Sequence, residues 1–278
     1  MDIARSNRQH NTKRRNILLL AALLVIAGTA FLLLRPKQSS RPHERVTLTH
    51  NGRTTQALVV YPESRNKAPI VILVHEIYGL SDWATHMADE LAGEGFLVIA
   101  PDMLSGHGPN GGGYDAFGNP DDRMRAISSL DPEGVLADLD AAVDYGKKLP
   151  TANGKIAVVG FSWGGWKAFD FATHRKDLSA TFVFYGTGPT DVATITAPVY
   201  GFYAGNDGDV DASVPGTQET MKTAGKRYEP VTYEGADHGF MRLGEDTINP
   251  SNANKVARDQ AFARMVKLLK EMKTAQPS

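Results

Sequence analysis

Ser162 lies in the pattern Gly-x-Ser-x-Gly, which residues 160–164 form as Gly-Phe-Ser-Trp-Gly. This pattern is typical of a nucleophile elbow, a tight strand-to-helix turn that projects a serine hydroxyl away from the backbone. The small flanking residues allow the strand and the helix to approach closely. Residues 155–159 are an apolar, β-branched run typical of a buried strand, and residues 163–174 read as a helix with several apolar positions. Because an ordinary strand-to-helix turn can show the same short pattern, further residues must support a catalytic role.

A serine hydroxyl needs a base before it can attack, and histidine is the usual base. In hydrolases built on a nucleophile elbow, the chain order is serine, then an acid, then histidine. Of the eight histidines, only His238 lies more than a helix's length beyond Ser162. It follows a predicted strand at residues 230–233, so we expect it on a loop at the end of that strand.

The acid that orients the histidine should also follow a strand, and residues 197–203 are such a strand. Asp207 is the first carboxylate after it, and we predict that Asp207 holds the imidazole of His238 in the correct tautomer. Asp209 and Asp211 lie in the same loop and are the alternatives. Each of these residues alone could be an ordinary loop or turn residue, but their joint order favours a catalytic triad.

A second apolar strand, at residues 71–74, leads into the polar pair His75 and Glu76. In this architecture the following loop supplies one N–H group of the oxyanion hole, and the residue after the nucleophile supplies the other. The backbone amides of Ile77 and Trp163 are therefore the candidates. We expect His75 to be a buried, hydrogen-bonded core residue, and a carboxylate such as Glu76 at the end of a buried strand requires a partner.

Four segments in this order resemble the dienelactone hydrolase family, and the resemblance spans about residues 45–272. It implies an α/β-hydrolase fold, a triad at Ser162, Asp207 and His238, and an auxiliary acid at Glu76. The segments are His-Glu-Ile-Tyr-Gly-Leu at 75–80, Gly-Phe-Ser-Trp-Gly-Gly at 160–165, Asn-Asp at 206–207 and Asp-His-Gly-Phe-Met-Arg at 237–242.

This chain departs from the family pattern at two places. The best-known members carry a cysteine nucleophile, whose ionisation the glutamate is thought to assist; with a serine, Glu76 is expected to hydrogen-bond the elbow or the substrate instead. The lactone-cleaving members also hold the substrate carboxylate with a tyrosine and an arginine, and the matching positions here are Leu104 and Gly106. The other family arginine corresponds to Arg242, which we predict to bind substrate together with Tyr78.

Alternating strands and helices after residue 44 predict a single α/β domain over residues 45–278, with a mostly parallel sheet covered by helices on both faces. The sequence contains no apparent internal repeat. Expected strands lie near residues 45–50, 55–61, 69–75, 96–100, 155–160, 180–185, 197–203 and 229–233, and expected helices near 81–94, 121–148 in two pieces, 163–174, 213–224 and 252–272.

The N-terminal part has a different character. Residues 17–34 form an 18-residue apolar run without charge, long enough as a helix to span about 27 Å, and we predict one transmembrane anchor here. A basic segment (1–16) precedes it and a short linker (35–44) follows. The alternative is a signal peptide cleaved near Ala30, or a twin-arginine export signal. The apolar run continues past Ala30, which favours the anchor. We then expect the domain to lie outside the cytoplasm, in the periplasm or another extracytoplasmic space.

The loop at residues 104–121 contains six glycines and follows a sheet strand, so it is expected either to border the active site or to be a mobile surface loop. We place His107 at the substrate pocket on this basis. The glycines do not form a phosphate-binding pattern. We find no pattern for a metal or an organic cofactor and predict that neither is bound.

The charge distribution limits the classes of partner that we expect, and the cysteine content bears on the compartment. The chain has 30 basic and 31 acidic residues, but the part after residue 44 is acidic, which argues against nucleic-acid binding. The basic segment beside the apolar run fits anionic lipid headgroups better. The absence of cysteine suits an oxidising compartment without requiring one.

The sequence therefore predicts a membrane-anchored serine hydrolase that cleaves an ester or lactone bond of a small molecule. An acyltransferase or a peptidase with the same triad remains an alternative. A catalytically silent, anchored binding module that retains the fold is the alternative outside the enzymes.

Overall fold

The computed structural model describes residues 41–50 and 52–274. The predicted anchor at residues 17–34 and the basic segment before it lie outside these residues. Within the described part of the chain, no helix is both long enough and apolar enough to cross a bilayer. The first described strand begins at His43, slightly before the expected start of the domain.

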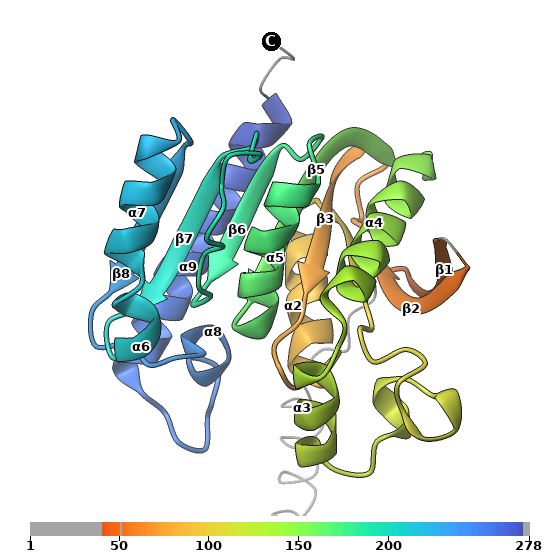
Figure 1. The fold of residues 1–278 in the computed structure, drawn as a ribbon. Helices are drawn as coiled ribbons and strands as arrows, with labels where there is room; N and C mark the ends of the chain where they lie inside the picture. The colour runs from red at the N-terminus through yellow and green to blue at the C-terminus, as the bar shows by residue number, and fades with distance from the viewer. Residues whose placement is uncertain (1–40, 51, 275–278) are drawn as a thin grey trace, which may run out of the picture. The chain divides into compact units, whose positions relative to one another are not determined.

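Eight strands form one sheet in the order β1-β2-β4-β3-β5-β6-β7-β8 (Figure 1). The strands β1 and β2 form an antiparallel hairpin at one edge, and β2 is also antiparallel to β4. All neighbours from β4 across to β8 are parallel, which confirms the predicted mostly parallel sheet. The strands are β1 His43–His50, β2 Arg53–Val60, β3 Ala68–Val74, β4 Leu97–Pro101, β5 Ala152–Phe161, β6 Ala180–Phe184, β7 Val199–Ala204 and β8 Tyr228–Tyr233.

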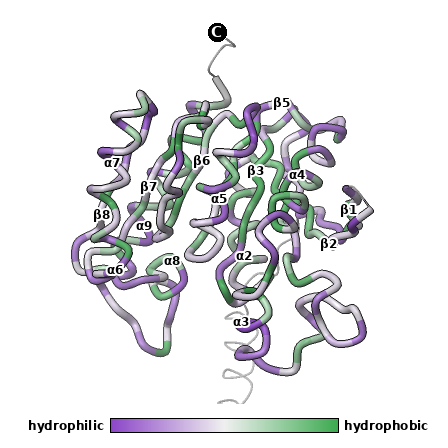
Figure 2. Tube along the Cα trace, viewed as in Figure 1, coloured by the Kyte–Doolittle hydropathy of each residue, from purple (hydrophilic) through white to green (hydrophobic). Residues whose placement is uncertain are grey.

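Helices cover both faces of this sheet. In Figure 1, α2 and α9 lie behind the strands, and α4, α5 and α7 lie in front. Apolar residues of each helix layer pack against one face of the sheet, and Figure 2 shows the hydrophobic residues concentrated in the central strands. The longer helices are α2 Asp82–Gly93, α3 Pro120–Ser128, α4 Pro132–Lys148, α5 Trp163–His174, α7 Val214–Thr223 and α9 Asn252–Thr274.

Capping residues divide the predicted helical region 121–148 into two helices. Asn119 precedes α3 and accepts a hydrogen bond from a backbone amide of its first turn. Asp131 does the same for α4, with a distance of 2.9 Å from its Oδ2 to the amide nitrogen of Gly134. A proline occupies the first turn of each helix, where no intrahelical N–H partner is lost.

Four short helices lie in segments for which no helix was predicted, or at the edge of a predicted one. They are η1 Pro109–Gly111, η2 Tyr114–Ala116, α6 Gly208–Asp211 and α8 Phe240–Leu243. Each spans about one turn, so it is too short to produce a helical repeat of apolar residues. All four follow the C-terminal ends of parallel strands, at the edge of the sheet where the candidate site lies.

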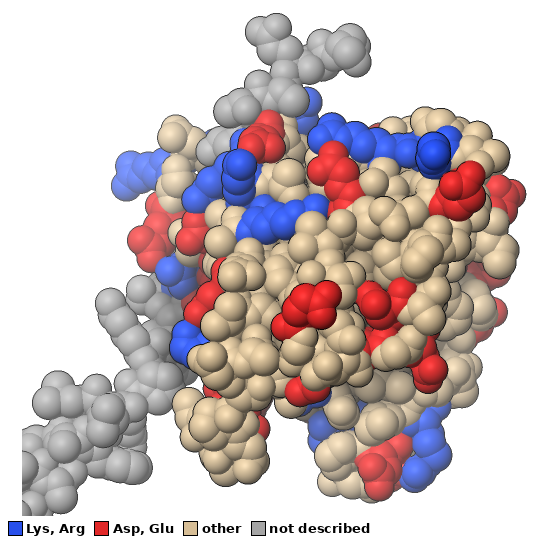
Figure 3. Space-filling model, turned by 90° about the vertical axis from the view of Figure 1, so that its left-hand side faces the viewer, with Lys and Arg blue, Asp and Glu red and all other residues tan. Residues whose placement is uncertain are grey.

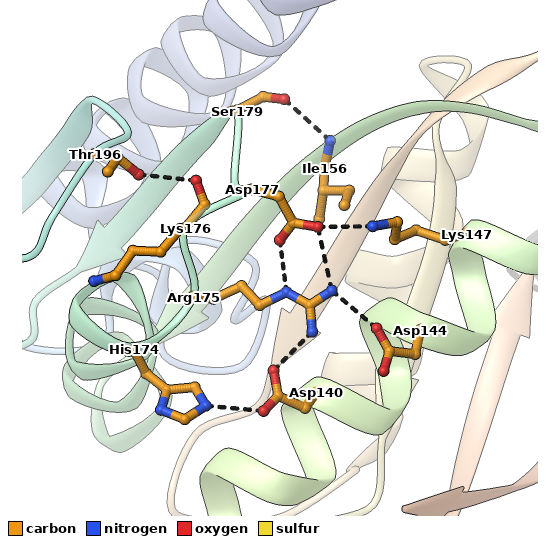
Figure 4. Close-up of polar contacts among 10 residues, drawn as sticks. All are labelled: Asp140, Asp144, Lys147, Ile156, His174, Arg175, Lys176, Asp177, Ser179 and Thr196. Carbon is orange, nitrogen blue, oxygen red and sulfur yellow. Dashed lines mark hydrogen bonds and ion pairs between the residues drawn. The ribbon is translucent and has the colours of Figure 1, made fainter.

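An ion-pair network holds the C-terminal end of α5 against α4, at the opposite edge (Figure 4). Arg175 follows α5, and its guanidinium donates to Asp140 and Asp144 of α4 at 2.9 Å each and to Asp177 at 2.6 Å. The Arg175 hydrogen bond, aided by Lys147, lowers the pKa of Asp177 to about 2. This network fixes the C-terminal end of α5, the helix that begins directly after Ser162.

Figure 3 shows the face of the molecule that lies at the left of Figure 1. Lys and Arg side chains are most numerous towards its upper end, with a smaller group at the lower end, and Asp and Glu side chains are scattered from top to bottom. Neither sign of charge covers this face as one continuous patch.

Candidate active site

Ser162 occupies a strained backbone conformation between β5 and α5, with φ 54° and ψ −116°. A positive φ is uncommon for residues other than glycine and costs free energy. Glycine is required at the neighbouring positions 160 and 164 because other backbone atoms pack closely against them. A Cβ atom at Gly160 would lie 1.9 Å from the carbonyl oxygen of Gly164, and one at Gly164 would lie 2.3 Å from the carbonyl oxygen of Val74. The segment therefore has the geometry of a nucleophile elbow.

The structure brings Ser162, His238 and Asp207 into one hydrogen-bonded chain. The Oγ atom of Ser162 lies 2.7 Å from Nε2 of His238. On the other side of the ring, Nδ1 of His238 lies 2.5 Å from Oδ2 of Asp207. With its proton on Nδ1, the imidazole donates to Asp207 and its Nε2 atom accepts from the serine hydroxyl. This arrangement can remove a proton from Ser162.

The two alternative acids take no part in this chain. Asp209 is exposed at the start of α6. Asp211 accepts a hydrogen bond from Thr232 at 2.9 Å, which joins α6 to β8. The geometry thus favours Asp207 as the orienting acid.

The loop that carries His238 is fixed by hydrogen bonds from the preceding residue, Asp237. Its carboxylate accepts from Asn206 at 3.1 Å and from Asn254 at 2.9 Å. Its backbone N–H donates to the amide oxygen of Asn254, which is buried at the start of α9. The two asparagine hydrogen bonds, that of Asn254 first, lower the pKa of Asp237. Loops after β7 and β8 are thereby held together around the imidazole.

The two candidate oxyanion donors lie at the ends of β3 and β5. After β3 the chain makes a turn, which is closed by a hydrogen bond of 3.0 Å from the N–H of Gly79 to the carbonyl oxygen of Glu76. Ile77 lies within this turn, and its own N–H does not take part in that hydrogen bond. Trp163 is the first residue of α5, where N–H groups have no partner within the helix. Its indole ring stacks on the imidazole of His75, with centroids 5.9 Å apart.

His75 is a fully buried core residue, as expected. Its Nδ1 atom lies 2.8 Å from the carbonyl oxygen of Glu76, and its Nε2 atom lies 3.3 Å from the backbone nitrogen of Met103. A neutral ring with the proton on Nδ1 satisfies both contacts, and burial lowers the pKa of His75. The residue supports the loop that carries Ile77.

Glu76 is buried and paired. Its Oε2 atom accepts from Nε of Arg242 at 2.9 Å, and its Oε1 atom accepts from the hydroxyl of Tyr185 at 3.2 Å. Burial raises the pKa of Glu76, and the charge and hydrogen bond of Arg242 oppose that shift. The Arg242 guanidinium also lies 4.8 Å from the centroid of the Tyr78 ring. Arg242 and Tyr78, both predicted to bind substrate, therefore contact each other beside this carboxylate.

The sequence reasoning missed Tyr185, which directly follows β6. It has a φ of 39°, it is buried, and its ring lies 5.1 Å from the imidazole of His238. Tyr185 therefore contacts both Glu76 and His238 with one side chain. A polar aromatic residue at the end of a central parallel strand was the signal that could have identified it.

The contacts of Glu76 lead to a graded prediction. Since its carboxylate binds Arg242 and Tyr185 rather than Ser162 or His238, Glu76→Gln should lower kcat by about tenfold or less. His238→Ala removes the base itself and should lower kcat by at least about 10⁴-fold. Steady-state kinetics on one ester substrate compare the two variants. Equal losses would show that Glu76 acts directly in the chemistry.

The glycine-rich loop at 104–121 is anchored to Asp102. The carboxylate of Asp102 accepts from the backbone N–H of Leu104 at 3.0 Å and from that of Tyr114 at 2.8 Å. The Tyr114 ring packs so closely on Gly79 that a Cβ atom there would lie 2.7 Å from it. Part of this loop thus borders the turn that carries Ile77, which agrees with the expectation that the loop lies beside the candidate site.

His107 occupies a different place. Its exposed side chain lines a cavity of about 10 Å³ together with Arg53, Met103 and Asp138, between β2 and α4. In the described part of the chain, its only hydrogen bond runs from its backbone N–H to Leu104. The structure does not bring His107 to the triad, because the loop turns towards β2 before it returns at Tyr114.

Comparison with known proteins agrees with this geometry. The family model of the dienelactone hydrolase family matches residues 55–273. This chain belongs to the dienelactone hydrolase family. A protein of Escherichia coli (strain K12) named as a carboxymethylenebutenolidase is 30% identical over 192 residues, which cover 64% of this chain and 69% of its own. Carboxymethylenebutenolidase 1 of Cupriavidus pinatubonensis is 34% identical over 127 residues, 44% of this chain and 53% of its own.

A solved structure described as a dienelactone hydrolase from Klebsiella pneumoniae shares the fold. Its TM-score is 0.72 at 23% sequence identity, and the match covers 84% of this chain and 99% of that chain. As a dienelactone hydrolase family member, the protein is a hydrolase that acts on ester or lactone bonds. The described residues contain no group of three or more His, Asp or Glu side chains placed to hold a metal ion.

Proposed function

We propose that this protein is a serine hydrolase that cleaves an ester or lactone bond of a small molecule through an acyl-enzyme. The observation that carries the proposal is the hydrogen-bonded chain from Ser162 through His238 to Asp207, at an elbow with φ 54°. A serine hydroxyl is too weak an acid to attack unaided, and this chain supplies the base that it needs.

In the first step, Oγ of Ser162 attacks the carbonyl carbon of the ester and its proton moves to Nε2 of His238. The carbonyl oxygen gains the negative charge, which the amides of Ile77 and Trp163 can stabilise. Asp207 stabilises the imidazolium that forms. The imidazolium then gives its proton to the leaving alcohol oxygen, and the acyl group remains on Ser162.

In the second step, a water molecule replaces the alcohol. His238 takes a proton from the water as it attacks the acyl carbon, and returns that proton to Oγ of Ser162 as the acyl bond breaks. The products are the acid and the original enzyme. With a lactone substrate, the alcohol and the acid are parts of one product molecule.

The resemblance to the family narrows the class of substrate that we propose. Similar proteins are named as carboxymethylenebutenolidases. The resemblance described above implies that Leu104 and Gly106 stand where lactone-cleaving members carry the tyrosine and arginine that bind a carboxylate. In this chain Arg242 is paired with Glu76. We therefore propose small esters or lactones other than dienelactone as the preferred substrates.

A panel of substrates on the full-length protein in detergent tests the proposal. Esters and lactones of graded acyl length should be hydrolysed, and a fluorophosphonate should label Ser162. Faster cleavage of peptides, or acyl transfer to an added alcohol that outpaces hydrolysis, would favour the peptidase or acyltransferase alternative. Failure of both labelling and hydrolysis would favour a silent binding module.

We also propose that residues 17–34 anchor the protein in a membrane, with the catalytic domain outside the cytoplasm. The proposal rests on an uncharged apolar run between two basic stretches. The mature protein should sediment with membranes and resist high-salt and alkaline washes. A C-terminal fusion to a reporter active only in the periplasm should work, and a cytoplasmic reporter should not. A mature N-terminus near Phe31 would instead show signal cleavage.

A further inference from the structure

The turn at residues 76–79, the oxyanion turn, carries the candidate donor Ile77 and packs against the glycine-rich loop. Gly79 closes this turn with a φ of 82°, a backbone conformation that favours glycine. A Cβ atom at Gly79 would lie 2.7 Å from Cδ2 of Tyr114 and 3.3 Å from Cδ1 of Leu104. The ring of Tyr114 thus lies directly against the backbone of the oxyanion turn.

Tyr114 is itself held at both its backbone and its side chain. Its N–H donates to Oδ2 of Asp102 at 2.8 Å, and Asp102 is buried directly after β4. Its hydroxyl accepts a hydrogen bond of 3.0 Å from Nη1 of Arg123, which belongs to α3. The guanidinium carbon of Arg123 also lies 4.5 Å from the centroid of the tyrosine ring, within the range of a cation–π contact. The ring therefore has a fixed position against Gly79.

The contacts of Arg123 are made with Tyr114 and not with an acid. Among the residues that the structure describes, no carboxylate lies within 4.0 Å of the Arg123 guanidinium. Arg125, two residues further along α3, differs in this respect, because it is exposed and forms an ion pair with Asp122. In the described part of the chain, the hydroxyl of Tyr114 is also the one hydrogen-bond acceptor of Arg123.

The oxyanion turn needs such support because it belongs to neither a helix nor a strand. The position of its N–H groups therefore depends on what packs against it. The side chains of Ile77, Tyr114 and Trp163 all pack against the same apolar cluster, which includes Leu104. Oxyanion donors are effective when they are fixed in place before the negative charge develops. A small displacement of one donor is enough to lower the rate.

We propose that Tyr114 is a positioning residue that holds the N–H of Ile77 where the oxyanion forms. The inference rests on the proposed acyl-enzyme chemistry of Ser162. As the bond from Oγ to the carbonyl carbon forms, the carbonyl π electrons move to oxygen and the serine proton moves to His238. Tyr114 transfers no proton in this step. Its ring acts through Gly79 on the position of the donor.

Variants of Tyr114 and Arg123 test this role on a neutral ester. Tyr114→Ala removes the ring and should lower kcat by about tenfold with less than about twofold change in KM, because the donor acts in the transition state. Tyr114→Phe keeps the ring and should stay within about twofold of the wild-type kcat. Arg123→Met removes the group that orients the ring and should lower kcat by about threefold. Should the alanine variant fail to fold, Tyr114→Leu keeps an apolar side chain and should lie between Ala and Phe.

A trifluoromethyl ketone provides a readout that loss of stability alone would not change. Oγ of Ser162 adds to its carbonyl carbon, and the hemiketal oxygen carries a negative charge at the same donors as in the reaction. The inhibition constant should therefore rise in Tyr114→Ala by about the factor by which kcat/KM falls. The matched control is Phe117→Ala, which removes another partly buried aromatic ring of the same loop. Both alanine variants should lower the urea midpoint, but only Tyr114→Ala should weaken the inhibitor and lower kcat.

The possible contrary results are distinct. Unchanged kcat and inhibition in Tyr114→Ala, or equal losses of kcat in Phe117→Ala, would overturn the inference alone. A rise in KM with unchanged kcat would also overturn it, because Tyr114 would then bind substrate. A wild type without ester turnover would overturn the proposed function and this inference with it.

Discussion

Replacing Ser162 with alanine is expected to lower kcat for ester hydrolysis by about 10⁵- to 10⁶-fold. The Oγ atom is the attacking atom, and without it neither His238 nor the oxyanion donors can form an acyl-enzyme. The residual rate should come from binding and from the oxyanion site acting on water. Pre-steady-state and steady-state kinetics with a chromogenic ester measure the loss, and fluorophosphonate labelling should disappear.

The folded state should be unaffected by this change. Alanine and serine have similar steric requirements at φ 54°, and the Ser162 side chain lies at the surface of the site. The urea midpoint of Ser162→Ala should thus equal that of the wild type. Ser128→Ala, which alters an exposed serine of α3, provides the matched control. Near-full esterase activity in Ser162→Ala would show that another residue is the nucleophile.

Asp207→Asn is expected to lower kcat by about 10⁴-fold. Asparagine is nearly the same size, but its amide group no longer stabilises the imidazolium and favours the wrong tautomer of His238. The contact concerned is the 2.5 Å approach of Oδ2 to Nδ1 of the ring. The KM value should change little, because Asp207 contacts the histidine rather than the substrate.

The neighbouring acids provide controls for this prediction. Asp209→Asn alters an exposed side chain and should leave kcat within about twofold of the wild type. Asp211→Asn loses at most one hydrogen bond to Thr232 and should reduce stability modestly, with little effect on kcat. A larger loss of kcat in either variant than in Asp207→Asn would show that Asp209 or Asp211, and not Asp207, orients His238.

The sheet was largely predictable because its strands are strongly patterned. Strands such as β3 are buried along their whole length and appear as continuous apolar runs, which is typical of a parallel sheet covered on both faces. The division of residues 121–148 was also predictable, since Pro132 and the cap Asp131 mark a new helix start. The one-turn helices such as α6 and α8 were not, because their residues match no helical repeat.

The catalytic order was predictable, but the contacts around Glu76 were not. The order Ser162, Asp207, His238 follows from one strand-ending motif after another, and the structure joins these residues. The ion pair with Arg242 links residues 166 positions apart, and no local pattern encodes such a contact. The hydroxyl of Tyr185 reaches the same carboxylate from the end of β6.

The placement of His107 shows the same limit. Loops at strand ends generally border the site, but the path of the 104–121 loop depends on Asp102. The carboxylate of Asp102 accepts a hydrogen bond from the N–H of Tyr114, and His107 lies beside Arg53 instead of at the triad.

Peptide mapping by mass spectrometry after an acid quench during turnover of a slowly deacylated ester tests the central claim most directly. The acyl-enzyme account predicts that the acyl mass appears on the peptide that contains Ser162, at up to one equivalent, and is absent from Ser162→Ala. An acyl group on a different residue would contradict the account. So would a burst of alcohol equal to the enzyme concentration without an acyl group on any peptide.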